Sequence, residues 1–148
     1  MKINNLLTLI LPLFILLSCA ETQEGNNDES LSDKADSLLK VVMNEHDEVM
    51  PNTLKLENLK KKIKAKMDSI EMDSAGIERV NSLFSKMDTA ILGMRDWMTG
   101  FERPADSLTA KEVVDYYLLE LKKIKNVSDQ TFKILPEAEK ELNKSDSL

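Results

Sequence analysis

The chain has 148 residues, of which 42% are hydrophobic, 31% charged and 5% aromatic, and its formal net charge is −6. One His and one Cys are too few for a zinc site of Cys and His ligands or for an internal disulfide framework, and four Gly provide no Gly-rich phosphate loop. This composition excludes most enzyme classes.

Residues 1–18 are predicted to be a bacterial lipoprotein signal peptide. Lys2 precedes an apolar run over 6–17, which is shorter than the roughly 20 residues of a membrane-spanning helix. The run ends in Leu16-Leu17-Ser18-Cys19, which resembles the lipobox of bacterial lipoproteins. The alternative is an ordinary secretory signal that contains a Cys. We favour Cys19 as the lipidation site, anchoring the protein to a membrane through its acyl chains. In some bacteria an Asp directly after the lipidated Cys retains a lipoprotein in the inner membrane. Ala20 occupies that position here, which favours the outer membrane of a Gram-negative bacterium.

Three further regions follow the signal peptide. Residues 19–31 are expected to form the lipidated Cys19 and a flexible acidic tether, because 21–30 contain no apolar residue. Residues 32–136 are predicted to form a three-helix bundle, and 137–148 a charged tail that is helical only in part. No segment alternates apolar and polar residues, so no sheet is expected.

The first predicted helix begins at Ser32 and carries an apolar stripe at steps of three and four. The stripe consists of Ala35, Leu39, Val42, His46, Val49, Leu56, Leu59, Ile63, Met67 and Ile70, with a polar position at Thr53. Pro51 lies within it. Because the stripe continues in phase across this proline, one long helix kinked at Pro51 is predicted.

The second and third predicted helices have clear start and stop signals. Asp73 is expected to cap the second helix, which Gly100 and Pro104 end. Thr109 and Glu112 have the spacing of a capping box for the third. The second stripe contains Ile77, Val80, Phe84, Met87, Ile91, Met94, Met98 and Phe101, widened by Leu83, Ala90 and Trp97. The third contains Val114, Tyr117, Leu118, Leu121, Ile124, Phe132 and Leu135. The fold class is therefore an all-α, up-down-up three-helix bundle with coiled-coil-like seams.

Folding the helices back on one another pairs position 46 with 100 and position 97 with 113. One end of the bundle then collects a layer of His46, Met50, Met94, Trp97 and Met98. The layer has three interpretations. The favoured one is a packed core in which Met fills irregular gaps. A second is a Cu(I) site with His46, Met50, Met94 and Met98 as ligands and Trp97 beside them. A third is a partly exposed surface that binds a partner.

Catalysis and nucleic-acid binding have little support in the sequence. A single His leaves no second base, and lipidation removes Cys19 as a nucleophile, so no catalytic residue is predicted. The chain is acidic and its Lys residues lack interleaved aromatic residues, which argues against nucleic acid as a partner. The expected function is a non-catalytic binding module of the cell envelope, facing the periplasm, with another envelope protein as partner. The alternative is a Cu(I)-binding lipoprotein, and the sequence indicates no oligomeric state.

Two stretches resemble a known family. The stretch 46–51, His-Asp-Glu-Val-Met-Pro, and the stretch 94–98, Met-Arg-Asp-Trp-Met, followed by Phe101, are similar to those of small helical lipoproteins of Gram-negative bacteria that carry the label "viral A-type inclusion protein". The resemblance covers most of the mature chain and implies a lipid anchor and a helical fold, but no activity. Two positions that carry Met in the family pattern are occupied by Thr53 and Arg95 in this chain. The absence of these two thioethers weakens a metal-binding role.

Overall fold

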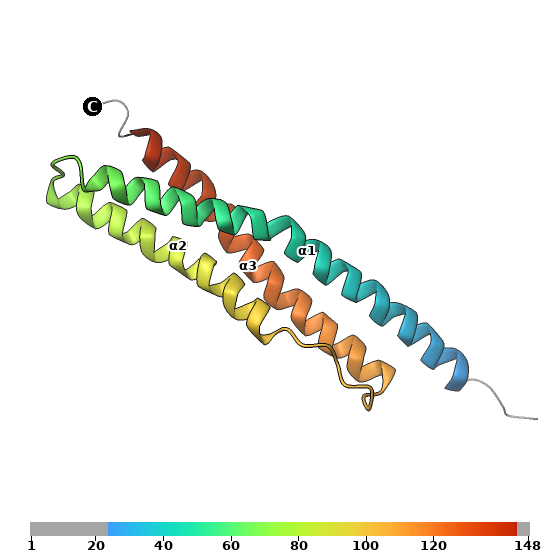
Figure 1. Cartoon of the computed structure of the whole chain (residues 1–148). Helices are drawn as coiled ribbons and strands as arrows, with labels where there is room; N and C mark the ends of the chain where they lie inside the picture. The colour runs from blue at the N-terminus through green and yellow to red at the C-terminus, as the bar shows by residue number, and fades with distance from the viewer. Residues whose placement is uncertain (1–23, 145–148) are drawn as a thin grey trace, which may run out of the picture.

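Three helices form an up-down-up bundle in the computed structural model, which describes residues 24–144 (Figure 1). They are α1 (Glu24–Met67), α2 (Ser74–Gly100) and α3 (Ala110–Lys144). Residues 24–144 contain no strand, so the predicted all-α bundle is confirmed. The predicted signal peptide and Cys19 lie outside the described residues.

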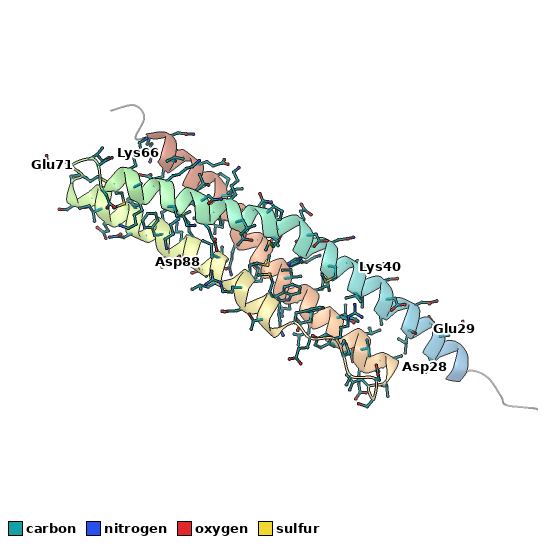
Figure 2. The ribbon with its side chains drawn as sticks, in the orientation of Figure 1. Asp28, Glu29, Lys40, Lys66, Glu71 and Asp88 are labelled. Atoms are coloured by element: carbon teal, nitrogen blue, oxygen red, sulfur yellow. The ribbon has the colours of Figure 1, made fainter. Side chains whose placement is uncertain are left out.

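α1 begins earlier than the sequence pattern predicts. The tether was expected to reach residue 31, but the helix already starts at Glu24, and this boundary is corrected. Adding residues to a helix that has already formed costs less free energy than starting a new helix. Asp28 and Glu29, near the free end of α1 (Figure 2), belong to its second turn. α1 also passes Pro51 without a break, which confirms one long helix, whereas the kink stays a prediction.

α3 continues beyond the proline that was expected to close it. The segment 137–148 was predicted to be a charged tail, yet α3 runs through Pro136 to Lys144. Ile134 and Ala138 are buried on either side of the proline, in the cluster that also contains Leu56 of α1. Packing on both sides of Pro136 therefore compensates for the backbone hydrogen bond that proline cannot donate.

Both predicted helix starts have the expected caps. The Asp73 side chain accepts a hydrogen bond from the backbone N–H of Gly76 at 2.8 Å. At α3, the Glu112 N–H donates to Thr109 Oγ1 at 3.3 Å, and the Thr109 N–H donates to Glu112 Oε2 at 2.8 Å. This backbone hydrogen bond lowers the pKa of the Glu112 carboxyl. The capping box is thus confirmed in both directions.

The core consists of apolar clusters stacked along the bundle. Most predicted stripe positions are buried in them, namely Ala35, Val42, Val49, Leu56, Leu59, Ile63, Val80, Met87, Ile91, Met94, Val114, Tyr117 and Ile124. Five predicted core positions are exposed, namely Ile70, Ile77, Met98, Leu118 and Phe132. On α3 the interior takes Thr131 in place of Phe132, so the predicted stripe there is out of phase by one residue.

An ion pair joins the last turns of α3 to α2. Glu141, only 9% exposed, accepts a hydrogen bond from the Arg79 guanidinium at 3.0 Å and contacts Lys144 Nζ at 3.3 Å. The hydrogen bond from Arg79 holds the pKa of Glu141 below its ordinary value. Ionised Glu141 is therefore favoured in the folded protein.

Replacing Glu141 with Gln should lower the free energy of unfolding by about 1.5 kcal/mol at neutral pH, because the change removes a charged hydrogen bond from a nearly buried site. Since the folded-state pKa is lowered, the stabilisation is present above the ordinary Glu value of 4.5 and is lost as the pH falls through the folded-state value. Urea denaturation at neutral and acidic pH measures this. Glu137→Gln is the control, since the Lys86–Glu137 pair is 57% and 46% exposed and is worth less. Equal losses for the two variants would contradict the prediction.

Candidate functional site: an aromatic layer where α2 ends

A continuous series of aromatic rings crosses the bundle where α2 ends. The ring centroids of His46 and Trp97 are 5.5 Å apart, and those of Trp97 and Phe101 are 4.9 Å apart. Phe101 lies 6.4 Å from Tyr116, which lies 5.4 Å from Tyr117. These separations are typical of interacting aromatic pairs. The layer therefore connects α1, α2 and α3 through ring contacts.

His46 lies on α1 at the edge of this layer. Its side chain is 19% exposed, and Nδ1 is 2.9 Å from Asp47 Oδ1. Because a carboxylate only accepts hydrogen bonds, Nδ1 carries the proton in this contact. Within the described residues Nε2 has no hydrogen-bond partner. The predicted meeting of His46 and Trp97 is confirmed by their ring contact.

Trp97 is the centre of the layer. It is 7% exposed, and its indole Nε1 is buried without an acceptor in residues 24–144. Its carbonyl accepts the N–H of Phe101 at 2.8 Å, which ends α2. A buried donor without a partner is uncommon in folded proteins and costs free energy. The indole N–H is therefore an unpaired donor enclosed by the layer, and an acceptor reaches it only if the surrounding side chains move.

The three methionines of the predicted layer have different environments. Met94 is 2% exposed and belongs to the same cluster as Trp97, with Met50 packed against it. Met98 is 41% exposed and does not belong to this cluster. Two of the three predicted thioethers thus lie beside Trp97, and the third faces solvent. Met98 is one turn beyond Met94, where the buried face of α2 continues through Trp97 instead.

The connection 101–109 shifts α3 relative to the predicted pairing. A tight reversal was expected to bring position 97 opposite 113, but Trp97 clusters with Ile124 and Val127. Val114 and Tyr117 instead pack with Ala35, nearer the start of α1. The connection runs on beyond the end of α2 before α3 begins (Figure 1). The predicted pairing was wrong because this segment extends along the bundle before it reverses.

A tyrosine fixes this connection to α3. The Tyr116 hydroxyl donates to the carbonyl oxygen of Glu102 at 2.5 Å and accepts the N–H of Glu102 at 3.2 Å. Sequence reasoning missed Tyr116, because its position between Val114 and Tyr117 does not fit the apolar stripe. The hydroxyl satisfies both backbone groups of Glu102 and so holds the loop beside the aromatic layer.

The chain was compared with protein-family models, curated proteins and solved structures, and none of the three comparisons gave a match. In the described part of the chain, no helix has an apolar stretch long enough to cross a bilayer. The same residues contain no group of three or more His, Cys, Asp or Glu side chains placed to hold a metal ion. Thioether ligands from Met lie outside that set.

Proposed function

We propose that the protein is a lipid-anchored, non-catalytic interaction module of the bacterial cell envelope, which binds its partner at the end of the bundle that carries the aromatic layer. The lipobox-like sequence before Cys19 supports the anchor. Ala20, which follows Cys19, supports an outer-membrane location in a Gram-negative bacterium, facing the periplasm.

The observation that carries the interaction role is a group of exposed apolar side chains at the aromatic end. There α1 and α3 extend beyond the end of α2 (Figure 1). Five large apolar side chains at this end are exposed by 40% or more, namely Val41, Met98, Leu108, Leu118 and Leu119. A partner that covers these side chains removes their apolar area from water, which favours binding. The proposed partner is another envelope protein.

The anchor is tested by Cys19→Ala in the full chain. The variant should be released from membranes, because the acyl chains contribute about 0.8 kcal/mol for each buried CH₂ group. Membrane and soluble fractions are compared by immunoblotting, with Ser18→Ala as the control that keeps the thiol. Continued sedimentation of Cys19→Ala with membranes would contradict the anchor.

The interaction role is tested by photo-crosslinking in cells from position 118, followed by mass spectrometry. A probe at Leu118 should return one consistent envelope protein. A probe at Leu54, which is 47% exposed against 45% for Leu118 but lies away from the aromatic end, should not. The absence of any consistent crosslinked protein from Leu118 would contradict the proposal.

Binding of Cu(I) is the alternative function, and the shared position of His46, Met50, Met94 and Trp97 favours it. The free Nε2 of His46 and the thioethers of Met50 and Met94 are soft ligands that suit Cu(I), and the Asp47 contact would orient the imidazole. Met98, the fourth ligand predicted from the sequence, faces solvent outside this cluster, so the alternative rests on three ligands.

This alternative is tested by titrating the full chain with Cu(I) against a competing chelator. Met94→Leu preserves the packing volume but removes the sulfur, and His46→Ala removes the imidazole. Each variant should weaken binding at least tenfold if these groups are ligands. Binding weaker than micromolar, or binding unchanged in both variants, would exclude the copper site.

A further inference from the structure

A groove between α2 and α3 is lined by residues near the start of α2 and the end of α3. These two helix ends lie at the end of the bundle opposite the aromatic layer (Figure 1). It is formed by two adjoining hollows of about 260 and 280 Å³, which share Lys86 and Glu137. Its charged lining comprises five basic side chains, Arg79, Lys86, Lys133, Lys140 and Lys144, and two acidic ones, Glu137 and Glu141. The groove is therefore positively charged within a chain whose net charge is −6.

The acidic residues of the groove are already paired. Lys86 Nζ lies 3.0 Å from Glu137, and Glu141 is held by Arg79 and Lys144. In contrast, Lys133 and Lys140 are exposed and make no ion pair within residues 24–144. Two ammonium groups in the groove are thus free to bind an anionic partner.

The spacing of these two lysines favours a regularly charged, extended partner. Lys133 and Lys140 are two turns apart on one side of α3, which separates them by about 10.5 Å along the helix axis. A polyproline II segment has three residues per turn and a rise of about 3.1 Å per residue, so acidic side chains three residues apart lie on one side, about 9 Å apart. The flexible lysine stems span the difference.

The remaining lining favours a peptide over a phosphate polymer. Gln130 supplies an amide that can donate to and accept from a peptide backbone. The Thr89 hydroxyl donates to the carbonyl of Ser85 at 2.9 Å and can accept a peptide N–H, and Ile134 lies at the apolar base. Glu137 stands between the two free lysines and is already paired with Lys86, so no anionic group of a partner is needed at this point. A peptide charged at every third residue places uncharged residues beside Glu137.

We propose that the α2–α3 groove binds an extended acidic peptide segment of a partner protein through Lys133 and Lys140. This groove is a second surface, separate from the aromatic end. It lies at the other end of the bundle from the start of α1, and α1, with 44 residues, is about 66 Å long. Figure 2 shows this separation, with Lys66 and Glu71 at one end of the molecule and Asp28 and Glu29 at the other.

The test measures binding of a fluorescently labelled peptide of Glu-Pro-Pro repeats to the full chain in uncharged detergent, by anisotropy. The peptide should bind, the Gln-Pro-Pro counterpart should not, and added salt should weaken the complex. The double variant Lys133→Gln/Lys140→Gln should raise the dissociation constant about fivefold or more, since it removes two ion pairs. The matched control is Lys122→Gln/Lys125→Gln, which removes two exposed lysines from the same helix and should leave binding unchanged.

Three results would overturn the proposal. The first is no binding of the Glu peptide, and the second is an equal loss of binding in the two double variants, which would indicate net charge alone. The third is tighter binding of polyphosphate that depends on Lys133 and Lys140, which would assign the groove to phosphate chains. Circular dichroism should show that both double variants are folded. The assay uses purified protein, so its result does not depend on the membrane anchor or on the surface around Leu118.

Discussion

Replacing Leu56 with Ala should lower the free energy of unfolding by about 3 kcal/mol, which is a large part of the stability of a small domain. Leu56 is completely buried on α1, and its cluster includes Met87 of α2 and Ile134 of α3. Truncation therefore loses apolar burial and leaves a cavity that three helices border. Urea denaturation followed by circular dichroism measures the change.

Leu54 provides a matched control for this experiment. It is the same residue type on the same helix, two positions earlier, but it is 47% exposed. Leu54→Ala should change the free energy of unfolding by no more than about 0.5 kcal/mol. If the two substitutions had similar effects, α1 would not pack with the face described here, and the assignment of the core would be wrong.

The face that α1 buries could be predicted because its stripe is regular. Ala35, Val42, Val49 and Leu56 follow one another at seven-residue intervals, and all four are buried. Such a repeat keeps one side of a long helix against its neighbours. The polar position at Thr53 remained inside the core because its hydroxyl donates to the carbonyl of Val49 at 3.0 Å.

The phase of α3 could not be read from apolar residues alone. Its buried face includes Glu120, Ser128, Thr131 and Glu141, whereas Phe132 is 40% exposed. Hydropathy favours Phe over Thr in the interior, but the packed neighbours decide which face is covered. Glu141 is buried because Arg79 pairs with it, and a partner 62 residues away leaves no local signal.

The candidate site was predictable in part for a related reason. The contact of His46 with Trp97 follows from the antiparallel reversal of α1 into α2, which a short turn fixes. The position of α3 depends on the path of the connection 101–109, and the sequence does not determine how far this segment extends. Tyr116 holds that path by bonding Glu102, a contact between loop and helix that periodicity does not reveal.

Trp97→Ala should destabilise the protein by about 3 to 4 kcal/mol, because it removes a large ring from a well-packed layer. Trp97 is 7% exposed and contacts both His46 and Phe101. Trp97→Phe should cost only about 1 kcal/mol. It keeps an aromatic ring in place and removes an indole N–H that has no acceptor in the described chain, which offsets part of the lost packing. Since this is the single Trp, circular dichroism replaces fluorescence as the measurement.

The comparison of these two variants separates packing from recognition at the aromatic end. Met98→Ala is the control for a neighbouring exposed residue and should change the free energy of unfolding by at most about 0.5 kcal/mol. If Trp97 serves only to pack the layer, Trp97→Phe should leave crosslinking from Leu118 unchanged. If the unpaired Nε1 donates to a partner, Trp97→Phe should reduce crosslinking while the fold is retained. A loss below about 1 kcal/mol for Trp97→Ala would mean that the layer is not part of the core, because a ring packed on two sides cannot be removed at so small a cost.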